Sequence, residues 1–262
     1  MISDVYSGVP KEIRKVIDPL VSEGDDYHKV HYRRMARTLK VILDQNPKGK
    51  LLELGTSGLV PLALKELTPE LEVHVTDFDL SLPSSGEHTV SLCGQSTTLP
   101  CYRLNLEEEY IPVADETFDY VLCSEVVEHM EVDPMFMLSE VNRVLKPNGM
   151  LILSTPNIAS SRNITKMLNG LDPYFYMQYR HTPSLYRHNY EYTVYSITSV
   201  VTSAGFNGSI WTEDTFEDPI MRDIDKLKEI GYTFKHIGDN IFVVARKIGP
   251  VVDRHPAVIY AD

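Results

Sequence analysis

A short apolar strand, a glycine turn and a short helix follow one another directly in the first quarter of the chain. Residues 50–54 are apolar apart from Lys50 and Glu53, the turn is Gly55-Thr56-Ser57-Gly58, and 59–67 carries the apolar residues of a helix. The glycines let the backbone approach a ligand closely, and the helix points its free amides at the same place. This unit predicts an α/β protein with a ligand site where the first strand ends.

Strands and helices continue to alternate after this unit. Apolar runs and turn signals predict further strands at 72–78, 120–124, 150–155, 209–212 and 240–246, and helices at 27–43, 193–205 and 225–230. Another helix is predicted to begin at Asp133-Pro134, which offers an N-cap and a first-turn proline. The alternation indicates an α/β fold with a mostly parallel sheet and helices on both faces.

We interpret residues 1–262 as one domain with five consecutive parts. They are an N-terminal helix (27–47), a core that carries the strand ends (50–155), an insertion (156–192), the C-terminal part of the sheet (193–248) and a tail (249–262). The insertion is long, rich in Asn and Tyr and weakly periodic, which is typical of a lid, an acceptor-binding segment or a poorly ordered one.

The composition is acidic. The chain has 25 Lys and Arg against 37 Asp and Glu, a formal net charge of −12. This charge repels polyanions, so nucleic acid is disfavoured as a partner. One basic cluster has helical spacing, and we interpret it as the solvated face of a helix; it consists of Arg33, Arg34, Arg37 and Lys40.

The three cysteines suggest neither a disulfide framework nor a metal site. Cys93, Cys101 and Cys123 are odd in number and never as close as in a CxxC motif, which favours a reducing compartment. The first residues lack the apolar core of a signal peptide, and no apolar run is long enough to cross a bilayer. We expect a cytoplasmic protein without membrane contact, and its oligomeric state stays open.

Five segments, in this order, resemble the motifs of class I S-adenosylmethionine-dependent methyltransferases. They are Leu51-Leu52-Glu53-Leu54-Gly55-Thr56-Ser57-Gly58, Val75-Thr76-Asp77-Phe78-Asp79, Arg103-Leu104-Asn105-Leu106-Glu107, Phe118-Asp119-Tyr120-Val121-Leu122-Cys123-Ser124 and Arg143-Val144-Leu145-Lys146-Pro147-Asn148-Gly149. The first segment has two glycines where the family usually shows three, and it lacks the GxGxxG of nicotinamide-binding folds. The resemblance extends from about Tyr27 to Arg246. It implies S-adenosylmethionine as cofactor and a Rossmann-like, mostly parallel sheet of seven strands with the last strand reversed.

The resemblance also implies roles for single residues. The strand acid and the glycine loop would hold the methionine half of the cofactor, namely Glu53, Gly55, Thr56, Ser57 and Gly58. A carboxylate after the second strand can accept both ribose hydroxyls. Asp77 and Asp79 are the candidates, and Asp79 fits the family's Asp-x-Ser better because Ser81 follows it.

Three further cofactor contacts are implied. Asn105 and Leu106 lie in the segment that contacts adenine, and Cys123 lies in the motif beside the cofactor. Asn105 stands where the family often has Asp, but its amide oxygen can accept a hydrogen bond from the amino group of adenine.

A second constellation follows the motif that contains Cys123. It consists of Glu125-Val126-Val127-Glu128-His129 and, further along, His188. The run resembles the Glu-x-x-Glu-His of ubiquinone-biosynthesis O-methyltransferases. Together with the later His-x-aromatic-Glu it resembles small-RNA 2′-O-methyltransferases. The resemblance implies Mg²⁺ or Mn²⁺ held by Glu125, Glu128, His129 and His188. In the alternative interpretation, Glu128 caps a helix, and one histidine, His129 ahead of His188, is a general base.

The leading hypothesis is an O-methyltransferase for a small hydroxylated acceptor, such as a sugar, a natural product or a phenol. Many sugar and natural-product methyltransferases resemble this sequence in the same segments. Two alternatives stay open: an RNA-end 2′-O-methyltransferase, which would need a basic surface, and a methyltransferase-like module that binds cofactor without turnover.

Overall fold

The computed structural model describes residues 9–22, 26–173, 177, 179, 181, 187–215, 224–233 and 235–261. The helices are α1 (Lys11–Ser22), α2 (Asp26–Leu43), α3 (Leu59–Leu67), the 3-10 helix η1 (Val127–His129), α4 (Pro134–Val144), α5 (Ser161–Leu168), α6 (Val194–Ser203) and α7 (Ile224–Glu229). The strands are β1 (Gly49–Leu54), β2 (Leu71–Asp77), β3 (Ser85–Leu92), β4 (Gln95–Arg103), β5 (Phe118–Ser124), β6 (Leu145–Pro156), β7 (Phe206–Glu213) and β8 (Asn240–Lys247).

These strands form one sheet in the order β3-β4-β2-β1-β5-β6-β8-β7. Neighbours from β4 to β6 run parallel, whereas β8 is antiparallel to both β6 and β7, which confirms a mostly parallel sheet with a reversed last strand. The predicted number of seven strands is wrong, because β3 adds an antiparallel eighth strand at one edge. The hairpin of β3 and β4 turns at Cys93-Gly94, both with positive φ, a turn that matches the twist of two paired strands.

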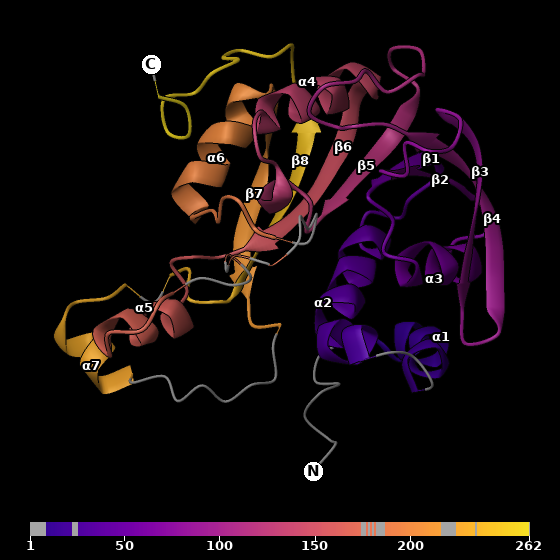
Figure 1. Ribbon diagram of the computed structural model, residues 1–262. Coiled ribbons are helices and arrows are strands. Elements are labelled where there is room, and N and C mark those ends of the chain that lie inside the picture. Colours follow the sequence, from indigo (N-terminus) through magenta and orange to yellow (C-terminus); the bar gives the residue numbers. More distant parts are fainter. Residues whose placement is uncertain are drawn as a thin grey trace.

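Helices cover both faces of the sheet, as Figure 1 shows. Helices α1 to α3 pack on one face, and α4 and α6 pack on the other. Side chains alternate along β1 as a buried strand requires, with Leu51 in the first core and Leu52 and Leu54 in the second. Both faces are therefore closed to solvent, and a ligand can approach β1 only at its ends.

The predicted insertion at 156–192 is described only in part. Residues 174–176, 178, 180 and 182–186 lie outside the described residues. The described part begins with α5, which the weak periodicity did not predict and which Ser160 caps by accepting a hydrogen bond from the Asn163 amide. In Figure 1, α5 lies beside α7, away from the helices that cover the sheet.

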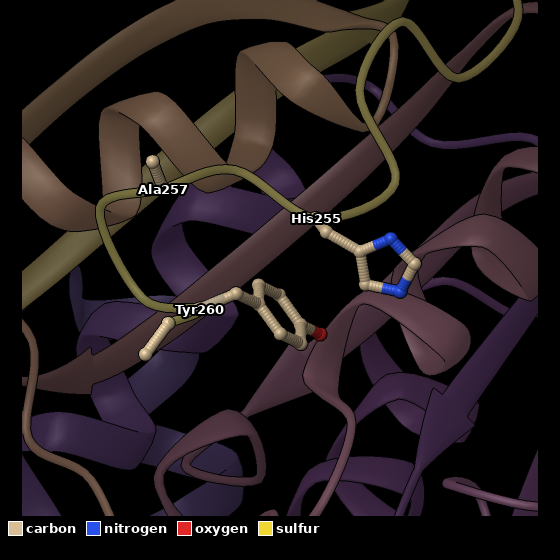
Figure 2. A pocket seen from close by; sticks show the side chains of 4 residues that line it. His255, Ala257 and Tyr260 are labelled. Carbon is tan, nitrogen blue, oxygen red and sulfur yellow. The ribbon is translucent and has the colours of Figure 1, made fainter.

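The tail folds back onto the start of α4. Asp133 caps that helix, as predicted, by accepting a hydrogen bond from the Phe136 amide at 3.0 Å. The same carboxylate accepts from Arg254 at 2.8 Å and from the Tyr260 hydroxyl. Figure 2 shows the shallow pocket that the tail forms from His255, Ala257, Tyr260 and Ala261. The pocket contains none of the predicted site residues.

Asp133→Ala is expected to destabilise the protein at neutral pH. It should also reduce the loss of stability that occurs as pH falls from about 4 to about 2. Burial opposes ionisation of Asp133, but the hydrogen bonds from Arg254 and Tyr260 outweigh it and lower the pKa to about 2. The stabilisation is therefore present above the usual pKa of about 4 and is lost as pH falls from there to about 2. Loss of the cap alone costs about 0.5–2 kcal/mol. Denaturant melts of both proteins at several pH values measure this.

Asp44→Ala is the matched control, because Asp44 forms an exposed pair with Lys40 within a helix turn. It should change the free energy of unfolding by less than about 0.5 kcal/mol. Equal losses in the two variants would mean that the tail contact adds nothing.

Candidate active site at the ends of β1 and β5

The predicted site residues gather where the topology of the sheet changes direction. The chain leaves β1 toward β2 and β4 on one side and then crosses to β5 and β6 on the other. α/β folds bind ligands in the crevice outside the strand ends at such a point. The glycine turn follows β1, and the segment from Glu125 to His129 follows β5.

The turn after β1 depends on its glycines. Gly55 has φ +62° and Gly58 has φ +78°, a conformation that side chains other than glycine rarely adopt. The Gly55 amide donates to the Thr76 hydroxyl at 2.9 Å, which ties the turn to β2. A Cβ on Gly55 would lie 3.4 Å from the Val126 side chain, so the turn lies against the segment that follows β5.

Glu53 is a buried carboxylate, and only one of its two oxygens accepts hydrogen bonds. Its side chain is buried at the end of β1, and Oε1 accepts from the Ser57 amide at 3.4 Å and the Ser57 hydroxyl at 3.1 Å. Oε2 is buried without a hydrogen-bond partner. Burial raises the pKa of Glu53 to about 7. A buried acid of this kind needs a cationic partner, and its place beside the turn suits an ammonium group of a ligand.

Two aspartates lie at the end of β2. Asp77 is its last residue, and its carboxylate accepts from the Phe78 amide at 2.8 Å and lies 3.6 Å from His88. Asp79 lies beyond the strand, fully exposed, and binds the amide and hydroxyl of Ser81. The geometry leaves both carboxylates within the strand-end region, so the ribose role of either stays a prediction.

The segment after β4 reaches the same edge. The Leu104 amide donates to the Asp77 carbonyl, and the Asn105 side chain accepts from the Glu107 amide. The Glu107 carboxylate accepts from three successive amides, those of Glu131, Val132 and Asp133, at 2.7–3.0 Å. Glu107 therefore links the predicted adenine segment to the loop that follows His129.

Two predicted cofactor contacts offer no polar group. Leu106 packs against the second hydrophobic core, and Cys123 is fully buried in β5. Burial raises the pKa of the Cys123 thiol. Their side chains can supply only van der Waals contact to a ligand.

Glu128, His129 and His188 meet at one point. Each offers a ligand atom, and these atoms lie within 4.8 Å of one another. The Glu128 carboxylate accepts from the Thr155 hydroxyl at 3.0 Å through Oε2, whereas the buried Oε1 has no partner. Burial, and next the charge of Glu125, raise the pKa of Glu128 well above its usual range.

A hydrogen bond at Nδ1 orients each of the two imidazoles. Nδ1 of His129 donates to the Arg187 carbonyl, and Nδ1 of His188 donates to the Glu191 carboxylate, each at 3.0 Å. Because a carbonyl only accepts, Nδ1 of His129 carries the proton, and its Nε2 is the nitrogen that can act as a ligand or base. Burial lowers the pKa of His129, which favours this neutral form.

Glu125, the fourth predicted metal ligand, lies outside this group. Its Oε2 binds Arg34 at 3.0 Å, and its Oε1 accepts from Ser154 at 2.8 Å and from Asn240 at 2.7 Å. Glu125 has φ +56°, so the backbone reverses directly after β5. The structure thus brings three of the four predicted ligands together and binds the fourth elsewhere.

Arg34 corrects one interpretation of the sequence. The sequence predicts that the basic cluster is a solvated helix face. Arg34 is instead only 7% exposed, because its guanidinium lies between α2 and the strand ends. The sequence contains a signal for this. His31, Arg34 and Thr38 recur at helical spacing and are all buried, a polar stripe along α2 that faces the protein.

The comparisons with known proteins point to one class. The methyltransferase domain family matches residues 52–153. The ubiquinone biosynthesis O-methyltransferase of Haemophilus ducreyi is 31% identical over 115 residues, which cover 41% of this chain and 45% of that protein. That of Rickettsia conorii is 48% identical over 141 residues, covering 53% of this chain and 45% of that protein. The chain spans about half the length of the curated relatives it matches.

Solved structures share the fold. A S-adenosylmethionine-dependent methyltransferase of Archaeoglobus fulgidus superposes with a TM-score of 0.55 at 15% identity, covering 85% of this chain and 100% of that chain. A chain of the complex between the Trm112 methyltransferase activator and a methyltransferase of Haloferax volcanii gives 0.57 at 12% identity, covering 90% and 98%.

The sheet order and the residues at its strand ends define a Rossmann-like methyltransferase domain. Residues 52–153 match a methyltransferase domain, and these similarities together support a class I S-adenosylmethionine-dependent methyltransferase. Within the described part of the chain, each helix is too short or too polar to span a bilayer.

Proposed function

We propose that this protein transfers the methyl group of S-adenosylmethionine to a hydroxyl of a small molecule, a sugar or a natural product. The observation that carries the proposal is the pair of unsatisfied acids at adjacent strand ends. Oε2 of Glu53 beside the glycine turn and Oε1 of Glu128 beside two histidines are both buried without a partner. The relatives named as O-methyltransferases support a hydroxyl as acceptor.

The residues at β1 and β2 fit the cofactor. Glu53 would bind the ammonium group of the methionine half, and the turn at Gly55 and Gly58 leaves room for a ligand against the backbone. Asp77 or Asp79 would accept the ribose hydroxyls. In this proposal the sulfonium side of the cofactor would face the end of β5.

The residues after β5 fit a divalent cation. Glu128, His129 and His188 would hold it, because one carboxylate oxygen lacks a partner and both rings are fixed through Nδ1. A bound Mg²⁺ or Mn²⁺ supplies a positive charge that lowers the proton affinity of the acceptor hydroxyl and orients it. With the cation bound, Nε2 of His129 would be a ligand and the proton of the hydroxyl would pass to solvent. Without the cation, His129, which burial favours in its neutral form, would accept that proton instead.

The test is calorimetry with S-adenosylhomocysteine, followed by transfer of a labelled methyl group to a panel of sugars, phenols, polyketides and RNA ends. We expect binding, and transfer to hydroxylated small molecules. At a ligand concentration of about 100 Kd, binding should stabilise the fold by about 2.7 kcal/mol. No binding by folded protein would refute the proposal. Binding without any transfer would favour a cofactor-binding module, and salt-sensitive transfer to RNA would favour the RNA-end alternative.

Exhaustive treatment with EDTA is expected to abolish methyl transfer, because the acceptor hydroxyl then loses the charge that activates it. Added Mn²⁺ or Mg²⁺ should restore it. Calorimetry on the same sample is the control, and the affinity for S-adenosylhomocysteine should not change, because Glu53 and the glycine turn do not depend on the cation. Full activity after EDTA would remove the cation from the proposal and leave His129 as the base.

We place the protein in the cytoplasm. Cys93, Cys101 and Cys123 are all free thiols, and two of them are buried, which supports a reducing compartment.

A further inference from the structure

The two acids that follow β5 have opposite surroundings, although only two residues separate them. The Glu125 carboxylate accepts three hydrogen bonds, from Arg34 of α2, Ser154 of β6 and Asn240 of β8. Glu128 has one partner, Thr155, and a buried oxygen with none. Glu128, whose carboxylate has the oxygen without a partner, is the acid that lies beside the two histidines.

The pair of Arg34 and Glu125 is built into the interior. Both side chains are about 9% exposed, and the second guanidinium nitrogen of Arg34 donates to the Tyr27 hydroxyl at 3.1 Å. Burial, and next the charge of Arg34, lower the pKa of the neighbouring His31 to about 3, so His31 brings no competing positive charge. For Glu125 to bind a cation, it would have to leave Arg34 as a buried charge without its partner, which is strongly unfavourable.

We propose that Arg34 is a positioning residue that keeps Glu125 out of the ligand set of the cation. The cation site then consists of Glu128, His129 and His188, and its remaining coordination positions stay open to the acceptor and water. This inference rests on the cation of the proposed function. It differs from the four-ligand site that the sequence implies, and it gives helix α2 a role at the strand ends.

The experiment measures Mn²⁺ affinity by electron paramagnetic resonance of free Mn²⁺, so activity is not needed. Glu128→Gln should weaken binding by more than about tenfold, the lower end of what even an outer partner of a metal site contributes. Glu125→Gln should weaken it clearly less than Glu128→Gln does, because it removes a nearby negative charge but no ligand. Binding of S-adenosylhomocysteine reports that each variant is folded.

Arg34→Met tests whether Arg34 acts on the cation site through Glu125 or only stabilises the fold. Without its counter-charge, Glu125 becomes available to the cation, so Mn²⁺ affinity should rise. In this background Glu125→Gln should reverse the gain, a non-additivity that a double-mutant cycle detects. Arg37→Met is the matched control, because Arg37 lies one turn further on α2 and forms a partly exposed ion pair with Glu213. It should leave Mn²⁺ affinity unchanged.

The outcomes separate the two proposals. If Glu125→Gln weakens Mn²⁺ binding as much as Glu128→Gln does, Glu125 is a ligand and the inference is overturned while the cation remains. If the unaltered protein binds no Mn²⁺, the cation itself is removed from the proposed function. Should Arg34→Met fail to fold, the comparison of the two glutamate variants decides.

Discussion

Replacing Gly55 with Val is expected to weaken binding of S-adenosylhomocysteine by more than about a hundredfold, which corresponds to about 2.7 kcal/mol. Gly55 has φ +62°, a region in which a β-branched side chain is strained. A Cβ there would also lie 3.4 Å from Val126, so the branches would press on the segment that carries the cation site. Calorimetry on the purified variant measures the loss.

Gly94→Val is the matched control for this variant. Gly94 also has positive φ, +75°, but lies in the turn between β3 and β4 with no atom within 4 Å of an added Cβ. It should carry similar backbone strain and keep its affinity for the cofactor. If both variants bind as the unaltered protein does, the glycine turn is not where the cofactor lies.

Affinity for S-adenosylhomocysteine is expected to fall about a hundredfold between pH 8 and pH 5, close to tenfold for each pH unit below the pKa. Burial raises the pKa of Glu53 to about 7 in the free protein. The ligand's ammonium group needs the carboxylate form, so binding below pH 7 must first remove a proton. The raised pKa also affects the stability of the ligand-free protein, in the opposite direction. Stability falls as pH rises from the usual Glu pKa toward 7, because over that range the carboxyl group ionises in the unfolded chain but not in the folded one.

Glu53→Gln should bind more weakly at pH 8 and show little change of affinity over this range. Calorimetry at pH 5, 6, 7 and 8 on both proteins provides the test, with circular dichroism at each pH to show that the fold persists. A pH profile of the variant parallel to that of the unaltered protein would assign the dependence to another group.

The elements that the sequence predicted are those buried on both faces or closed by a strong turn. Strands β1, β2, β5 and β6 are mostly buried, and α4 begins at the predicted cap. The sequence did not predict α1, α5, β3 or β4. Helix α1 contains Pro19 inside it, which argues against a helix in a sequence, and most side chains of the β3 and β4 hairpin are exposed, so neither strand has an apolar run.

The candidate site could be predicted in its parts because parallel strands bring their carboxyl ends to one edge. Glu53, Glu128, His129 and His188 all lie at strand ends or are brought to one. The pairing of Arg34 with Glu125 could not be predicted, because it depends on how α2 packs, which a single sequence does not specify. Nor could the sequence predict which of the two acids after β5, Glu125 or Glu128, keeps an oxygen without a partner.

The sheet order has a consequence for how the chain reaches its native state. Strand β8 lies between β6 and β7, so β7 contacts no other strand of the sheet until β8 has inserted. Before that step β6, which is apolar on both faces, presents an open edge of unpaired amides and carbonyls. Pairing across so long a stretch of chain forms slowly. Intermediates without β8 are therefore the species of this protein most exposed to aggregation, and refolding yield should depend on protein concentration more than on the stability of the finished fold.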